Sequence, residues 1–290
     1  MSAFFDIFLL EGLINGLLLG GVLALLALGL NLVFGVIDVV WICYAELVMI
    51  GMYAMYYFVS VYGFPIWVAV PLSIAAIGVL GMVLHVLVIA PLLGAAPINQ
   101  LLATGGVLFI LQSFATVAFG IDFRNLGIRL PVLQFAEMHF SYSRLLAFAA
   151  ALIGMLLVYF FMKKTYVGTA IRAISQDRQI MALMGVDVRR LYLVTSALGG
   201  ALAGLASCLL VLQYDIHPFV GLSFGPITFL ICVLGGLGNF VGGFVAAFVF
   251  ADIISLGGLF SDLEWGYVLA FAFFIVMMFI RPAGLLARRS

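Results

Sequence analysis

The sequence predicts an all-α integral membrane protein with about eight to nine transmembrane or re-entrant helical segments. Of its 290 residues, 67% are hydrophobic and only 8% are charged, and the mean hydropathy is +1.34. Soluble domains are about 45–50% apolar and about 25% charged, so this chain has too few charges to cover a water-facing surface. The composition therefore excludes a soluble enzyme, and twelve basic against twelve acidic residues leave no polybasic surface for nucleic acid.

Long apolar runs with short connections fill the chain as a single transmembrane domain, residues 1–290. A helical span needs about 20 apolar residues. Runs such as 145–162 are apolar on every face, which favours helices over the alternating strands of a barrel. The expected segments lie at about 8–34, 40–60, 65–90, 99–120, 145–162, 191–213, 225–237, 240–258 and 265–280.

The pair of segments within 225–258 differs from the others, because the first is short and residues 235–243 between them are rich in glycine. The pair is either two spans or a re-entrant pair. Broken backbone at membrane depth is tolerated only where protein covers it or where it lines a wet cavity. The exposed helix N-terminus of such a break can hold an anion, so the break is a candidate anion site.

Basic residues set the expected orientation, since they collect in cytoplasmic loops. Residues 163–190 and the tail after 280 are rich in Lys and Arg, so both are expected in the cytoplasm. Residues 251–264 contain three acids and no basic residue, and we expect them outside. Counting spans from 163–190 places 121–144 and the N-terminus outside as well.

The polar segment 163–190 contains residues that typically begin and end short helices. Residues 169–175 can form two turns, Ser175 or Asp177 can cap a second short helix, and Gly185 can end it. We expect two short amphipathic helices on the cytoplasmic side, with Ile171, Ile174, Ile180 and Leu183 on one side. Such helices either rest on anionic lipid or dock into a groove of a soluble partner.

Part of this segment, Gly168-Thr-Ala-Ile-Arg-Ala-Ile-Ser-Gln-Asp-Arg and Ala182-Leu-Met-Gly-Val, resembles the cytoplasmic coupling loop of the branched-chain amino acid family of ABC-importer permeases. The shorter, LivH-like subunit is the nearer match. Further similar stretches, in the same order as in the family, lie at 28–36, 46–53, 233–239 and 281–285. The resemblance covers nearly the whole chain.

The resemblance implies an ABC importer permease fold in the bacterial inner membrane. It implies a second homologous permease, two cytoplasmic ATP-binding subunits and a periplasmic solute-binding protein as partners, and alternating access driven by the ATPases. The expected solutes are branched-chain or other hydrophobic amino acids; the alternatives are urea, short amides and aromatic or other carboxylic acids. The residues that match the ATPase contact are Arg172, Ala173, Gln176, Asp177, Ala182 and Gly185.

The chain itself is not expected to be an enzyme. Lys164-Thr165 lacks the preceding glycines of a phosphate loop, so ATP and Mg²⁺ belong to the partner subunits and no cofactor is expected here. His85, His139 and His217 have no ligand spacing, and we expect no catalytic or metal site. The rival functions are a stand-alone secondary transporter and a membrane assembly subunit without a pathway.

Polar groups inside apolar segments are expensive, and this makes them candidates for the translocation pathway. Asp38 and Glu46 are the strongest candidates. The alternative is that both lie at a helix break near the membrane–water interface. In relatives, Asn-Phe-Ala-His-Gly precedes this glutamate, whereas this chain has Trp41-Ile-Cys-Tyr-Ala45. The difference affects the helix geometry or the solute recognition expected at this position. The candidate pathway residues are Asn31, Asp38, Tyr44, Glu46, Gln112, Thr228, Gly238 and Asn239.

Overall fold

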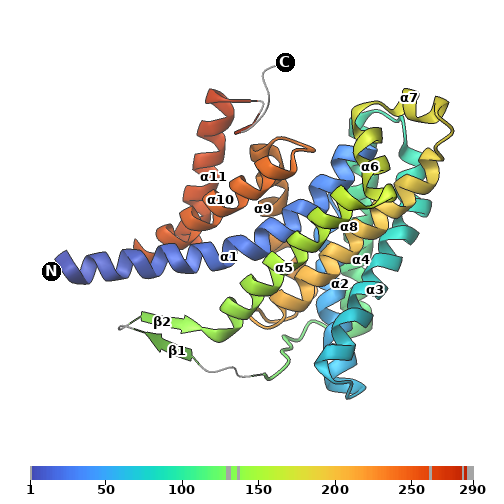
Figure 1. Cartoon of the computed structure of the whole chain (residues 1–290). Helices are drawn as coiled ribbons and strands as arrows, with labels where there is room; N and C mark the ends of the chain where they lie inside the picture. The colour runs from blue at the N-terminus through green and yellow to red at the C-terminus, as the bar shows by residue number, and fades with distance from the viewer. Residues whose placement is uncertain (1, 129–131, 136–137, 261–262, 283, 286–290) are drawn as a thin grey trace.

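The protein is a bundle of tilted helices, with one small hairpin outside it (Figure 1). The computed structural model describes residues 2–128, 132–135, 138–260, 263–282 and 284–285. Seven helices are long and apolar enough to cross a membrane, and α9 and α11 are shorter apolar helices. Each of the nine predicted apolar segments overlaps one of these helices, which confirms the predicted fold class.

The first half of the chain contains four helices, two of which change their winding near their ends. The bounds are α1 Ser2–Ile37, α2 Tyr44–Tyr56 with a π-helical extension Tyr57–Val61, α3 Ile66–Leu84 with extensions His85–Ile89 and Ala90–Leu92, and α4 Pro97–Phe119. The chain between α1 and α2 is not helical.

The second half begins with a feature that the sequence did not predict. Within the expected loop 121–144, strands β1 (Val132–Phe135) and β2 (Met138–Ser141) pair antiparallel. The all-α prediction is therefore corrected by one hairpin. The helices that follow are α5 Tyr142–Lys164, α6 Tyr166–Gln176, α7 Arg178–Leu183, α8 Val188–Leu210, α9 Val220–Gly235, α10 Phe240–Phe260 and α11 Leu263–Ile280.

Small residues allow the closest helix contacts. A Cβ atom added at Gly16 of α1 would lie 2.8 Å from the backbone of Asp252 in α10. One added at Gly200 of α8 would lie 2.6 Å from the carbonyl oxygen of Ile77 in α3, and one at Gly81 would lie 2.7 Å from that of Ser196. Backbone therefore touches backbone at both interfaces.

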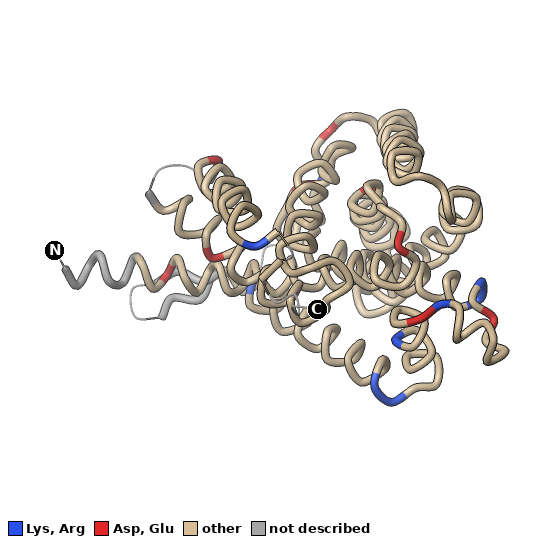
Figure 2. Tube along the Cα trace, turned by 90° about the horizontal axis from the view of Figure 1, so that it is seen from above, with Lys and Arg blue, Asp and Glu red and all other residues tan. Residues whose placement is uncertain are grey.

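The two ends of the bundle differ. Helices α6 and α7 lie at the upper end in Figure 1, and the β1–β2 hairpin lies at the lower end. Seen from above in Figure 2, most of the Lys and Arg residues gather along one edge. At the lower end, Arg124 and Ile216 form an antiparallel bridge, which ties the segment after α4 to the connection between α8 and α9.

Helix α4 is the least enclosed of the spans, because few of its residues are buried. Its apolar side chains Leu102, Phe109 and Val117 are 68%, 67% and 87% exposed. Polar side chains of α4 nevertheless point into the bundle, since Gln100, Thr104 and Gln112 are buried.

Candidate functional site

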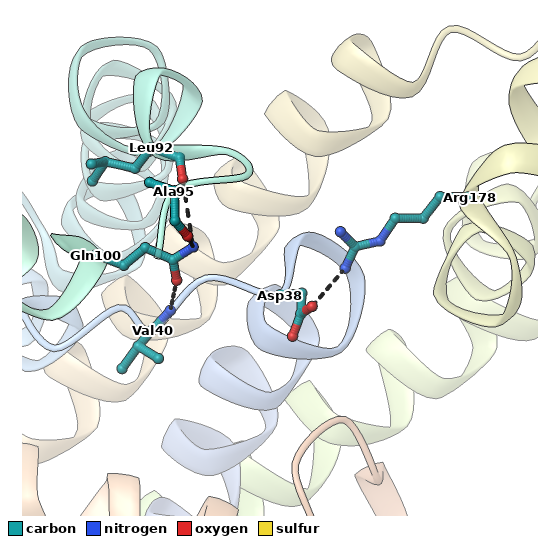
Figure 3. Close-up of polar contacts among 6 residues, drawn as sticks. All are labelled: Asp38, Val40, Leu92, Ala95, Gln100 and Arg178. Carbon is teal, nitrogen blue, oxygen red and sulfur yellow. Dashed lines mark hydrogen bonds and ion pairs between the residues drawn. The ribbon is translucent and has the colours of Figure 1, made fainter. Parts of the chain in front are cut away.

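The non-helical segment 38–43 is partly buried, at Val39, Trp41 and Cys43, and is hydrogen-bonded to α4. The amide of Val40 donates to Oε1 of Gln100 over 3.4 Å, and the hydroxyl of Thr104 donates to the carbonyl of Val40 over 3.0 Å. Nε2 of Gln100 also donates to the carbonyls of Leu92 and Ala95 (Figure 3). These bonds satisfy backbone groups that would otherwise be unpaired in an apolar surrounding.

Because α4 holds the 38–43 segment against the bundle, helix α2 begins deep within it. Its first turn contains Glu46, whose Oε1 accepts a 3.0 Å hydrogen bond from Nε2 of Gln112. Gln112 is twelve residues beyond Gln100 on α4, which is about 18 Å along the helix axis. The chain from Val40 to Glu46 therefore runs along α4 from the end that holds α6 and α7 toward the middle of the bundle.

A cavity of about 280 Å³ opens beside the start of α2. Its walls come from α2, α4 and α9, together with the 38–43 segment and α1. Apart from Tyr44, Glu46 and Thr228 the side chains that line it are apolar, with Trp41 adding a ring nitrogen. The lining residues are Leu30, Trp41, Ile42, Tyr44, Ala45, Glu46, Leu101, Leu108, Gly221, Leu222, Gly225, Pro226, Thr228 and Phe229.

Glu46 is the charged residue of this cavity. It has no exposed surface, and its Oε2 has no hydrogen-bond partner among the residues that the structure describes. A Cβ atom at Gly221 would lie 2.6 Å from both carboxylate oxygens. Only glycine at this position leaves room for the carboxylate in its present place.

The structure brings four of the predicted pathway residues together. Tyr44, Glu46 and Thr228 line the cavity, and Gln112 holds Glu46. The hydroxyl of Tyr44 donates to the carbonyl of Gly199 over 3.2 Å. The hydroxyl of Thr228 donates to Phe224 in its own helix over 2.7 Å.

Three other predicted residues lie elsewhere, at the turn between α9 and α10. Oδ1 of Asn31 accepts from the amide of Gly238 over 3.2 Å, and Oδ1 of Asn239 accepts from the amide of Gly242 over 3.0 Å. The turn begins after Gly235, seven residues beyond Thr228, about 10 Å along α9. These amides already have partners, so the structure does not favour the predicted anion site in the glycine-rich break.

The glycine-rich break is instead a compact connection between two separate helices. Gly236 and Gly238 have φ values of 93° and 79°, which favour glycine. A Cβ atom at Gly35 of α1 would lie 2.8 Å from the Cα atom of Gly238. The amide of Leu285 donates to the carbonyl of Leu234 over 2.7 Å, so the described end of the chain closes over this turn.

Asp38 is exposed and lies with the polar helices rather than with Glu46. Its Oδ2 is 3.5 Å from Nη2 of Arg178, the first residue of α7 (Figure 3). Its φ of 60° is positive, a conformation that Asp tolerates better than most residues. Of the two interpretations of Asp38, the structure supports the helix break near the interface.

Helices α6 and α7 form as the capping residues in the sequence predict. Asp177 caps α7, because its Oδ1 accepts from the amides of Gln179 and Ile180 over 2.9 and 3.0 Å. Gly185 follows α7 with a φ of 82°. The cap of α6, which begins at Tyr166, was not predicted: the hydroxyl oxygen of Thr165 accepts from the amide of Gly168 over 3.0 Å.

The prediction that four apolar residues share one side of these helices is wrong. Ile171 and Ile174 of α6 are fully buried against the bundle, whereas Ile180 and Leu183 are 57% and 89% exposed. The extended backbone at Asp177, with φ −151° and ψ 109°, turns α7 away from α6. Ile180, Leu183 and the 75% exposed Met184 form an apolar surface that we call the α7 tip.

Five of the residues that match the family's ATPase contact lie on the outer side of α6 and α7. Arg172, Gln176, Asp177, Ala182 and Gly185 are exposed, and Ala173 is partly buried. They flank the α7 tip along the chain. In the sequence, the α7 tip is indicated by the apolar residues that follow Asp177, the N-cap of α7.

Removing either charge of the Asp38–Arg178 pair is expected to weaken the link between α7 and the 38–43 segment. The variants Asp38→Asn and Arg178→Gln should each lower solute transport by up to about fivefold, because an exposed ion pair is worth about 0.2–1 kcal/mol. The double variant should be no worse than either single one. Initial uptake rates in proteoliposomes measure this, and additive losses would contradict a direct link.

Comparison with known proteins identifies the family. The family described as branched-chain amino acid transport system/permease component matches residues 12–278. The chain is 28% identical to the high-affinity branched-chain amino acid transport system permease protein BraD of Pseudomonas aeruginosa, over 96% of both chains. It is 25% identical to LivH of Escherichia coli K12, over 97% of this chain and 96% of LivH. A probable LivH of Methanocaldococcus jannaschii is also 25% identical, over 96% and 91%. The chain therefore belongs to the branched-chain amino acid transport permease family, as a multi-pass membrane protein.

Proposed function

We propose that this chain is the membrane-spanning permease subunit of an ATP-binding-cassette importer in a bacterial inner membrane. It translocates branched-chain or other hydrophobic amino acids by alternating access. A second homologous permease, two cytoplasmic ATP-binding subunits and a periplasmic solute-binding protein complete the assembly. Hydrolysis of ATP with Mg²⁺ belongs to the ATP-binding subunits, since the chain has no phosphate loop.

The observation that carries the proposal is the exposed α7 tip beside the Asp38–Arg178 pair. An apolar tip on a capped short helix suits a groove in a soluble partner. Its neighbour Arg178 contacts Asp38, which begins the 38–43 segment. That segment leads directly into the first turn of α2 and the cavity. Movement of α7 by an ATP-binding subunit would therefore be passed to the cavity wall.

The apolar walls of the cavity favour a hydrophobic solute over urea or short amides. Leu101, Leu108 and Phe229 offer no hydrogen bonds from their side chains. A urea site would need donors and acceptors on several sides, because an unpaired polar group in a buried site is costly. The relatives' printed names point the same way, since they describe branched-chain amino acid transport.

Co-purification of the ATP-binding subunits tests the docking. Leu183→Glu is expected to lower the amount of bound ATP-binding subunit at least about tenfold, because it places a charge in a desolvated contact. The matched control is Phe123→Glu, which changes a 72% exposed apolar residue beside the Arg124–Ile216 bridge at the other end of the bundle. Equal recovery with both variants would contradict docking through α7 and favour a lipid-bound role for these helices.

A stand-alone secondary transporter is the second candidate, because buried acids such as Glu46 serve ion-coupled carriers. The two functions separate in liposomes that contain the chain alone. Uptake of leucine driven by a proton or sodium gradient without ATP-binding subunits would favour the carrier. Uptake that requires the ATP-binding subunits and ATP supports the importer.

A further inference from the structure

No basic side chain among the described residues forms an ion pair with the Glu46 carboxylate. Helices α2, α4 and α9, which form the cavity walls, contain no Lys, Arg or His. Gln112 satisfies Oε1 of Glu46 over 3.0 Å. Oε2 has no partner in the described part of the chain, and the residue is fully buried. A buried carboxylate with a free oxygen is costly unless it is protonated or pairs with a cationic group or a hydrogen-bond donor.

We propose that Oε2 of Glu46 binds the ammonium group of an α-amino acid whose aliphatic side chain lies against the apolar walls of the cavity. The inference rests on the proposed function and deepens it, since it names the group by which the permease itself recognises the solute. Gln112 acts as a positioning residue, because its amide occupies one carboxylate oxygen and leaves the other for the solute.

The remaining walls suit the rest of such a solute. Leu101, Leu108, Leu222 and Phe229 line the cavity and favour an apolar side chain. The volume of about 280 Å³ lies just below the range of about 300–1,000 Å³ for sites of drug-sized ligands, so it fits a small molecule.

The start of α2 suits the carboxylate of the solute. Tyr44, Ala45 and Glu46 form the first turn of α2 and line the cavity. The N-cap residue Cys43 gives no side-chain hydrogen bond to this turn. The amides of Tyr44 and Glu46 donate to the carbonyls of Trp41 and Cys43 over 3.3 and 3.1 Å, so the carboxylate would meet the positive end of the α2 dipole and not a free amide of either residue.

The side of Glu46 that faces α9 is kept open by glycine. A Cβ atom at Gly221 would lie 2.6 Å from Oε1 and from Oε2. Any larger residue would push the carboxylate from its position beside Gln112. Gly221 of α9 thus leaves the space that the carboxylate of Glu46 in α2 occupies, although 175 positions separate the two residues.

The first measurement is ATP-driven leucine uptake by the assembled importer in proteoliposomes. Glu46→Gln keeps the shape of the side chain and should lower uptake at least about tenfold, since it removes a charge-assisted hydrogen bond. Glu46→Asp keeps the charge and should retain part of the uptake. The control Thr195→Val changes a buried hydroxyl that bonds within α8, away from the cavity, and should leave uptake unchanged.

The second measurement is the thermal unfolding midpoint of the permease pair without the binding protein, because a ligand that binds the native state raises it. The probes are leucine, 3-methylbutylamine, which lacks the carboxylate, and 4-methylpentanoate, which lacks the amino group. Leucine and 3-methylbutylamine should raise the midpoint of the unmodified protein, and 4-methylpentanoate should not. Glu46→Gln should abolish both shifts.

The outcomes separate this inference from the proposed function. Failure of the unmodified importer to take up any hydrophobic amino acid would overturn the proposed function. With uptake intact, three results would overturn only the role of Glu46. These are unchanged uptake by Glu46→Gln, an equal midpoint shift with 4-methylpentanoate, and no shift with leucine.

Discussion

Replacing Gln100 by leucine is expected to lower the free energy of unfolding by about 2–4 kcal/mol, because a buried unpaired polar group costs about 1–3 kcal/mol. Gln100 is the partner of the Val40 amide and of the carbonyls of Leu92 and Ala95. Leucine fills a similar volume but offers none of these bonds. Titration of the purified chain with a denaturing detergent measures the loss.

Asn99→Leu is the matched control for this prediction. Asn99 is the adjacent amide side chain on α4 and is exposed, so its replacement should change stability by less than about 0.5 kcal/mol. An equal effect of the two substitutions would show that the bonds of Gln100 do not support the 38–43 segment. Transport should fall with Gln100→Leu even in the fraction that remains folded, because this segment positions the start of α2.

Replacing Gly200 by leucine is expected to have an even larger effect, a destabilisation of about 3 kcal/mol or more, because the side chain has no space between α3 and α8. A Cβ atom at Gly200 would lie 2.6 Å from the carbonyl oxygen of Ile77 and 3.2 Å from the Cα atom of Gly81. Both are backbone atoms, so the helices would have to separate. The folded fraction after extraction, measured by size-exclusion chromatography, should fall sharply.

Gly106→Leu supplies the control for Gly200→Leu. Gly106 also lies within a spanning helix, but no described atom beyond its own stretch of α4 lies within 4 Å of the position of its Cβ. The isolated chain should therefore tolerate this change, with extraction and elution like those of the unmodified chain. If both variants fold equally well, the close approach of α3 and α8 is not required.

The positions and order of the apolar helices could be predicted from the sequence because apolar run length depends on the local sequence alone. The caps of α7 are local as well: Asp177 and Gly185 lie within nine positions of each other, and both act as expected. The β1–β2 hairpin was missed because it is short and lies in a polar connection that hydropathy treats as a loop.

The candidate site was predicted only in part, because its contacts join distant positions. Glu46 and Gln112 were each singled out as polar groups in apolar segments, but their hydrogen bond spans 66 positions. The role of Gln100 depends on the course of the 38–43 segment, 60 positions earlier, which no local pattern gives. The contact between Asn31 and the glycine-rich turn has the same character, because 207 positions separate Asn31 from Gly238.

The weak enclosure of α4 has a consequence for how fast the cavity can open. The polar side chains Gln100, Thr104 and Gln112 join α4 to the 38–43 segment and α2. Hydrogen bonds of this kind contribute about 1 kcal/mol each, so lateral displacement of α4 requires breaking a few discrete bonds rather than disrupting a dense interior. The rate at which α4 separates from α2 and the 38–43 segment should therefore rise with each of these bonds that is removed.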